Sequence, residues 1–144
     1  MLSNIPSIIS PQLLAILCEM GHADTIVLGD ANFPAKTCAK RGNCAYIRAD
    51  GIGTTELLKA ILTLMPLDYC DKPVKLMKPD RGVTVDIWQE YISEIKKADS
   101  RGEECIEYIE RDDYYAESEK AFCVVQTGDT AIYANIIITK GVIE

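Results

Sequence analysis

Residues 21–34, with the sequence GHADTIVLGDANFP, are the stretch that decides the fold, and they include the only histidine of the chain. The apolar run from Thr25 to Leu28 predicts a buried strand, and the glycines near its two ends indicate turns. His22 therefore precedes the strand and Asp30 follows it, so both polar side chains lie where a strand meets a loop, a common location for functional groups. The simpler interpretation is that His22 only hydrogen-bonds near a helix end and that Asp30 only caps the next turn. The spacing by itself leaves both interpretations open.

Helical and strand patterns alternate along the rest of the chain. Helices are predicted to begin near Pro11, Thr55 and Asp86, and a polar helix is predicted over 111–120. The predicted strands share short apolar or alternating runs and cover 25–29, 45–48, 74–77, 106–109, 122–126 and 131–138. The polar and basic residues 35–44 are expected to form a loop.

The last two predicted strands are joined by Thr127-Gly128-Asp129-Thr130, a turn-forming segment that predicts a β-hairpin. The expected fold is therefore α/β, a single domain over residues 1–144 with one mixed β-sheet, helices on both faces and a hairpin at the end. A chain of 144 residues suits one domain and can bury a sizeable core without disulfides or metals.

Composition and charge exclude several classes of function. The formal net charge is −7 and no basic cluster is present, so neither nucleic acid nor an anionic membrane surface is expected as a partner. No apolar run approaches the roughly 20 residues that are required to cross a bilayer. The N-terminal segment lacks the early positive charge and uninterrupted apolar run of a signal peptide, so the expected location is cytoplasmic.

The six cysteines are expected to be reduced thiols, because thiols in the cytosol are rarely oxidised. Cys18 and Cys123 lie in apolar segments and are predicted to be core residues, whereas Cys38 and Cys44 are predicted to be more exposed. No pair has Cys-x-x-Cys spacing, and one histidine is too few for an ordinary zinc site. No metal site is therefore predicted.

Eight segments match a known family in order along the chain. They are Ile9-Ser10-Pro11, Gly21-His22-Ala23-Asp24, Asp30-Ala31-Asn32-Phe33-Pro34, Arg48-Ala49-Asp50-Gly51, Glu119-Lys120-Ala121-Phe122, Thr127-Gly128, Tyr133-Ala134-Asn135-Ile136 and Lys140-Gly141-Val142. With them the chain resembles, essentially from end to end, the sugar mutarotase family that contains fucose mutarotase and ribose pyranase. The segments 32–34 and 48–51 are similar to the fucose branch. Ala23 departs from the family's usual glycine, and because alanine rarely adopts a positive φ, an ordinary or slightly shifted backbone is expected there.

The resemblance implies an isomerase that interconverts the α and β anomers of L-fucose or a related monosaccharide by ring opening and closure. The ring oxygen gains a proton while the anomeric hydroxyl loses one, without redox change, so no cofactor is implied. In the family's pattern His22 is the proton donor, a role that suits a side chain whose ordinary pKa is about 6.5. Asp30, Arg111, Tyr133 and Asn135 are implied to bind the sugar, and their types offer the donors and acceptors that a polyol needs.

Simpler interpretations exist for some of these residues. Arg111 could form only a surface ion pair with an acidic sequence neighbour, a contact worth about 0–1 kcal/mol. Tyr133 could be an ordinary core residue. Asn135 is harder to explain in this way, because a buried amide in an apolar strand needs hydrogen-bond partners.

Alternative functions also remain open at this point. They are a ribose-type pyranase that interconverts pyranose and furanose rings, a non-catalytic monosaccharide-binding protein, and a structural protein without a ligand. A histidine near Asp30 favours an enzyme, because binding a neutral sugar requires no titrating group. The resemblance also implies a ring-shaped homo-oligomer, expected to be a decamer, in which a neighbouring copy completes each site. The apolar run 136–138 agrees with this, since closed symmetric assembly buries such surface.

Overall fold

The computed structural model describes residues 2–144. Its strands are β1 (Thr25–Gly29), β2 (Ala45–Ala49), β3 (Val74–Met77), β4 (Ile106–Ile109), β5 (Cys123–Thr127) and β6 (Ile136–Thr139). Its helices are α1 (Pro11–Glu19), α2 (Ala35–Gly42), α3 (Thr54–Leu62), α4 (Ile87–Ala98) and α5 (Arg111–Glu119), with a short 3₁₀ helix, η1, at Gly102–Cys105. Ser10 caps α1 by accepting the Leu13 N–H at 3.1 Å, as the Ser-Pro pair predicts.

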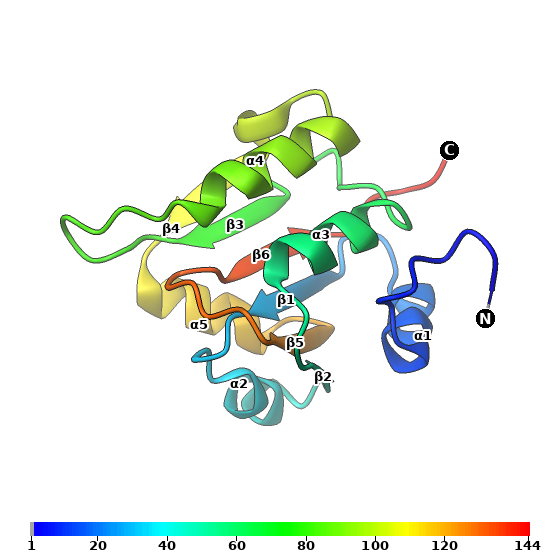
Figure 1. Ribbon diagram of the computed structural model, residues 1–144, viewed down its shortest axis with the longest axis horizontal. Helices are drawn as coiled ribbons and strands as arrows, with labels where there is room; N and C mark the ends of the chain where they lie inside the picture. The colour runs from blue at the N-terminus through cyan, green and yellow to red at the C-terminus, as the bar shows by residue number, and fades with distance from the viewer. Residues whose placement is uncertain (1) are drawn as a thin grey trace.

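β1 lies inside a six-stranded sheet of order β2-β5-β1-β6-β3-β4 (Figure 1). It pairs in parallel with β5 and antiparallel with β6. The β2–β5 and β3–β4 pairs are parallel and the β3–β6 pair is antiparallel, so β6 alone among the six opposes the others. The mixed sheet is thereby confirmed. The carboxyl ends of β1, β3 and β4 meet the start of β6 at one end of the sheet, where loops that carry functional groups converge.

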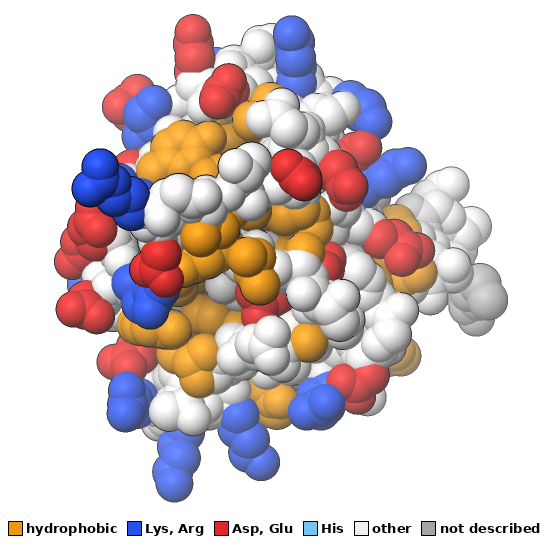
Figure 2. Space-filling view, turned by 60° about the vertical axis from the view of Figure 1, so that its left-hand side comes forward, with side chains coloured by type: hydrophobic (Ala, Val, Ile, Leu, Met, Phe, Trp, Pro, Cys, Tyr) orange, Lys and Arg blue, Asp and Glu red, His pale blue; other side chains and the backbone are white. Residues whose placement is uncertain are grey.

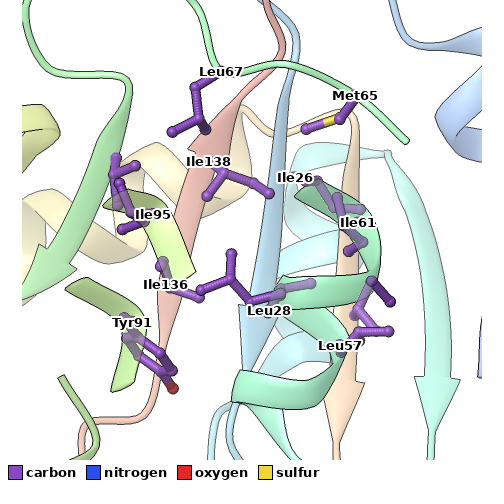
Figure 3. Close-up of a cluster of buried hydrophobic side chains, with 14 of the residues drawn as sticks. Ile26, Leu28, Leu57, Ile61, Met65, Leu67, Tyr91, Ile95, Ile136 and Ile138 are labelled. Carbon is purple, nitrogen blue, oxygen red and sulfur yellow. The ribbon is translucent and has the colours of Figure 1, made fainter. Parts of the chain in front are cut away.

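Side chains of the central strands alternate between two cores. Ile26, Leu28 and Ile136 belong to a first core, which α3 and α4 cover (Figure 3) and to which α1 contributes buried leucines. Val27 and Ile137 belong to a second core, which α2 and α5 cover on the opposite face. All five side chains are at most 2% exposed. The prediction of helices on both faces is confirmed, and the sheet between them is a rigid support for the loops at its ends.

The predicted terminal hairpin is wrong. β5 and β6 do not pair with each other, because β1 lies between them and pairs with both. The glycine of the predicted turn, Gly128, has another use: a Cβ there would lie 2.7 Å from the Gly51 nitrogen, so the two loops approach too closely for a side chain. β6 also begins at Ile136, and residues 131–135 form an irregular segment instead of a strand.

Residues 35–42, which were expected to form a loop, are helix α2. Ala35, Cys38 and Ala39 lie on one helical face and are buried in the second core, while basic side chains cover the outer face. Asn43 ends the helix in the left-handed conformation with φ of 51°, a common helix terminus. The segment was predicted as a loop because most of its residues are polar, and its apolar stripe is narrow and made of small side chains.

The described cysteines are all free thiols. Cys123 is buried, as predicted, and Cys44 is half-buried. The predictions for Cys18 and Cys38 are wrong: Cys18 lies on the outer face of α1, and Cys38 is buried because α2 turns it inward. No helix within residues 2–144 combines the length and apolar character needed to cross a membrane.

Candidate functional site

A cavity of about 190 Å³ opens at the end of the sheet toward which β1 and β3 point. Its polar lining comes from Asp30, Asn32, Arg111, Tyr133 and Asn135, and its apolar lining comes from Phe33, Met77, Tyr115 and Ile132. Figure 2 shows this side of the molecule, where hydrophobic side chains gather near the centre and charged ones surround them. The volume suits a small molecule, below the range of drug-sized pockets.

Asp30 and Asn135 form the buried polar part of the cavity. The Asp30 side chain follows β1 directly and is almost fully buried, and its Oδ1 accepts the Asn32 N–H at 2.9 Å. Burial raises the pKa of the Asp30 carboxyl, and backbone hydrogen bonds from Asn32, Phe33 and Ala134 partly oppose that rise. The Asp30 N–H donates to Asn135 Oδ1 at 2.9 Å, which leaves the Asn135 NH₂ group as a donor for a ligand.

Arg111 and Tyr133 form a second polar group at the cavity. Arg111 Nη2 donates to the Tyr133 hydroxyl at 2.9 Å and to Asp80 Oδ1 at 3.0 Å. The Asp80 N–H also donates to the Tyr133 hydroxyl, at 3.2 Å. Asp80, together with Tyr133, raises the pKa of the Arg111 guanidinium above its usual value. Arg111 therefore pairs with a residue from the distant loop after β3, and the simpler expectation of a pair with its sequence neighbours is not met.

Aromatic side chains also line the cavity. Phe33 and Tyr115 stack with ring centroids 5.8 Å apart, and Tyr114 meets the Phe33 edge at 5.9 Å. Met77 is buried beside them at the end of β3. This aromatic wall offers apolar surface to C–H groups, while the polar lining residues offer hydrogen bonds to hydroxyls.

His22 lies outside this cavity, beyond the other end of β1. The strand that separates His22 from Asp30 spans about 13 Å at roughly 3.3 Å per residue. The His22 Nε2 atom is 2.8 Å from Asp68 Oδ1, and the His22 side chain is 61% exposed. Four of the five predicted site residues are thus brought together in one chain, and His22 is not among them.

Asp68 is a partner of His22 that sequence reasoning missed. It is buried in the loop before β3, and Arg101 holds that loop by donating from Nη2 to the Asp68 carbonyl at 2.8 Å. Burial acts to raise the pKa of the Asp68 carboxyl, but hydrogen bonds from Cys70 and His22 outweigh it and hold the pKa below its usual value. A carboxylate in this position fixes the orientation and tautomer of an imidazole. The only signal in the sequence was a carboxylate in a loop, which is too common to select.

The backbone at Ala23 also differs from the expectation. Ala23 adopts φ of 67°, so alanine here occupies the left-handed region that the usual glycine would occupy without strain. Two hydrogen bonds fix it: the Ala23 N–H donates to the Lys140 carbonyl at 2.9 Å, and the Lys140 N–H donates to the Asp24 carbonyl at 2.9 Å. The Asp24 carboxylate accepts the Gly21 N–H at 2.7 Å and so stabilises the turn before β1.

The geometry limits the chemistry that the cavity supports. Among residues 2–144, no three His, Cys, Asp or Glu side chains come close enough together to hold a metal ion. The cavity is lined by the carboxylate of Asp30, the guanidinium of Arg111, the amides of Asn32 and Asn135 and the side chains of four residues with apolar or aromatic groups, and Tyr133 and Tyr115 add hydroxyls to this lining. The fold and this lining define a small mixed-sheet α/β protein with a pocket suited to a polyol.

Comparison with known proteins agrees with that class. A family model described as the RbsD / FucU transport protein family matches residues 3–143. The fucose mutarotase of Danio rerio is 47% identical over 147 residues, which cover 99% of this chain and 94% of that protein. FucU from Bifidobacterium longum has a similar structure, with a TM-score of 0.93 and 48% identity over 97% of this chain and 99% of that one. The fucose mutarotase from Streptococcus pneumoniae, solved in complex with L-fucose, has a TM-score of 0.92 and 45% identity over 99% of this chain and 100% of that one. The chain belongs to the RbsD / FucU family.

Proposed function

We propose that this chain is an isomerase, a mutarotase that interconverts the α and β anomers of L-fucose. Relatives that share more than 40% of its residues over nearly their whole length are fucose mutarotases. The cavity supports this function because hydrogen-bonding groups and aromatic side chains line it together. A 6-deoxy sugar such as L-fucose presents hydroxyls together with one methyl group, so both kinds of surface find a partner.

The reaction needs proton transfer and orientation only. To open the ring, the ring oxygen must gain a proton and the anomeric hydroxyl must lose one, and closure on the other face of the aldehyde gives the second anomer. In this proposal Asp30 accepts hydrogen bonds from sugar hydroxyls, Arg111 and Tyr133 hold others, and the Asn135 amide donates one. His22 supplies the proton, a contribution of roughly 10²–10⁴-fold for one well-placed acid or base.

His22 must then come from a neighbouring copy of the chain. The observation that carries this step is the placement of His22 and Asp30 at opposite ends of β1. His22 is exposed, and large apolar side chains that also belong to this end of the sheet are exposed as well, Tyr69 at 69% and Ile143 at 76%. Ile132, at the cavity, is 56% exposed. Two exposed surfaces of this kind on one chain are suited to meet each other in an assembly.

The same geometry supports the proposed ring. A contact between the His22 end of one copy and the cavity end of the next is head-to-tail, and such contacts close into rings when the rotation between copies permits it. We propose a ring-shaped homo-oligomer, a decamer, with one shared site at each contact.

Magnetisation-transfer NMR on L-fucose, D-ribose and D-galactose tests the function. The proposal predicts accelerated exchange between the two pyranose anomers of L-fucose. Acceleration confined to pyranose–furanose exchange of D-ribose would instead favour the ribose-type enzyme. Sugar binding without acceleration of any exchange would favour a non-catalytic binding protein.

A further inference from the structure

Tyr133, at the cavity, has a backbone conformation that needs external support. Its φ is 55°, in the left-handed region that large side chains rarely adopt. Strained conformations of this kind persist only where the surrounding structure holds them, and they concentrate at functional sites. The contacts of the irregular segment 131–135 show what holds this one.

Two side chains of α4 hold the segment from the side of the first core. Trp88 Nε1 donates to the Tyr133 carbonyl at 3.1 Å, and the Tyr91 hydroxyl donates to the Ala134 carbonyl at 2.7 Å. Tyr91 is fully buried, and the Trp88 ring packs on Tyr108 with centroids 5.2 Å apart. Both donors are therefore fixed by packing, on the face of the sheet opposite the aromatic wall.

On its other side the same segment supplies the cavity with polar groups. The Tyr133 hydroxyl accepts hydrogen bonds from Arg111 and from the Asp80 N–H, and Asn135 Oδ1 accepts the Asp30 N–H. Two consecutive carbonyls are thus anchored to α4 while the side chains on either side of Ala134 line the cavity. Rotation of the Tyr133 or Ala134 peptide would displace these side chains from their partners.

We propose that Trp88 and Tyr91 are positioning residues, which hold the carbonyls of Tyr133 and Ala134 so that the Tyr133 hydroxyl and the Asn135 amide are preorganised for the sugar. The inference rests on the proposed function for the identity of the ligand. Because neither residue reaches the cavity, both act through segment 131–135. Their loss weakens sugar binding, whereas proton transfer in the fully bound state is little changed.

Trp88→Phe and Tyr91→Phe test this, since each removes one donor and keeps an aromatic ring. Each variant is expected to bind L-fucose about 3- to 10-fold more weakly in calorimetric titration, the effect of one lost hydrogen bond. The exchange rate at saturating L-fucose should stay close to that of the wild type. In the Tyr133→Phe background, the further effect of Trp88→Phe on affinity should shrink, because both changes act on one group. Thr55→Ala is the matched control: it removes a 2.6 Å hydrogen bond from α3 to Glu90 of α4 and leaves the two carbonyl contacts intact.

A second measurement needs no sugar and separates this inference from the proposed function. The Asp80 amide donates to the Tyr133 hydroxyl, so its hydrogen exchange, followed by NMR, should accelerate in Trp88→Phe and Tyr91→Phe but not in Thr55→Ala. Folded variants with wild-type affinity and unchanged Asp80 exchange would overturn the inference. If the wild-type protein does not bind L-fucose, the proposed function alone is overturned. The hydrogen exchange of the Asp80 amide still tests whether α4 positions segment 131–135.

Discussion

Asp30 offers a test in which stability and binding change by different amounts. Asp30 as a residue is only 4% exposed, and its carboxylate accepts hydrogen bonds from backbone N–H groups around the cavity. Asp30→Asn keeps one acceptor oxygen of similar shape and removes the charge. Asp30→Ala removes every acceptor and leaves the surrounding N–H groups to find other partners. The two variants together separate what the charge does from what the hydrogen bonds do.

The size of the stability effect follows from the hydrogen bonds. The Phe33 N–H also donates to the Asp30 carbonyl at 3.0 Å and keeps that partner, so alanine strands the N–H groups of Asn32 and Ala134. Each stranded buried donor costs about 1–3 kcal/mol. We expect Asp30→Ala to lose about 2–4 kcal/mol, since water in the cavity replaces part of the loss. That is roughly 6–12 °C in Tm at about 3 °C per kcal/mol for this chain length. Asp30→Asn should stay within about 1 kcal/mol of the wild type.

The pH dependence of stability has a definite sign. Burial raises the pKa of Asp30 in the folded state, so protonation favours folding. The wild type should therefore gain stability relative to Asp30→Asn as the pH falls through that raised pKa. This gain in stability is complete below about pH 3.9, which is the pKa of an aspartate in the unfolded chain. At higher pH the wild type carries a buried charge at Asp30, which lowers its stability, whereas the neutral amide of Asp30→Asn carries no such penalty.

Sugar binding should respond in both variants. A hydrogen bond to a charged group contributes about 1.5–3 kcal/mol, which corresponds to roughly 10- to 150-fold in affinity. Asp30→Ala should approach that loss, and Asp30→Asn should lose less because its amide still forms hydrogen bonds. Calorimetric titration with L-fucose and thermal unfolding between about pH 3 and pH 8 measure these effects. Equal stability of the two variants, or wild-type affinity in either, would refute the reasoning.

Three further predictions concern other parts of the molecule. His22→Asn should lower the rate of anomer exchange by about 10²–10⁴-fold, with sugar affinity and circular dichroism unchanged. Asp68→Asn should lower the rate less. Exchange near the wild-type rate in His22→Asn would exclude the proton-donor role. Ala23→Gly should raise the free energy of unfolding by about 1 kcal/mol, because glycine adopts the left-handed φ without strain and keeps the same backbone hydrogen bonds; a loss of stability in chemical denaturation would contradict this. Exchange activity should survive both chelator and reductant, and loss on chelation that one metal restores would contradict the metal-free account.

Local patterns in the sequence were sufficient for the central elements. The apolar run of β1 between two glycines, and the Ser-Pro start of α1, each have one favourable local structure, so strand and helix form where predicted. The pairing of β5 and β6 depends on which strand fills the space between them, and no local pattern contains that information. Helix α2 was missed because its buried side chains, Ala35, Cys38 and Ala39, are small and are surrounded by basic residues.

The candidate site was predictable to the extent that residue type carries the chemistry. Asp30, Arg111, Tyr133 and Asn135 meet at one cavity because the ends of β1 and β4 and the start of β6 meet there. Asp68 and Asp80 were not predicted as partners of the site residues, because they lie in irregular loops, where acidic residues are common. His22 also illustrates the limit: it lies only eight residues before Asp30 in the sequence, but the extended strand between them places the two residues at opposite ends of β1.

The most direct test of the shared site mixes two inactive proteins, His22→Ala and Tyr133→Ala, under conditions in which subunits exchange. One variant retains an intact cavity and the other an intact histidine. If each site takes His22 from one copy and the cavity from the next, random equal mixing makes about one quarter of the contacts fully intact. Anomer exchange of L-fucose should then return to about a quarter of the wild-type rate. No recovery despite proven subunit exchange, or a monomer with full wild-type activity, would contradict the account.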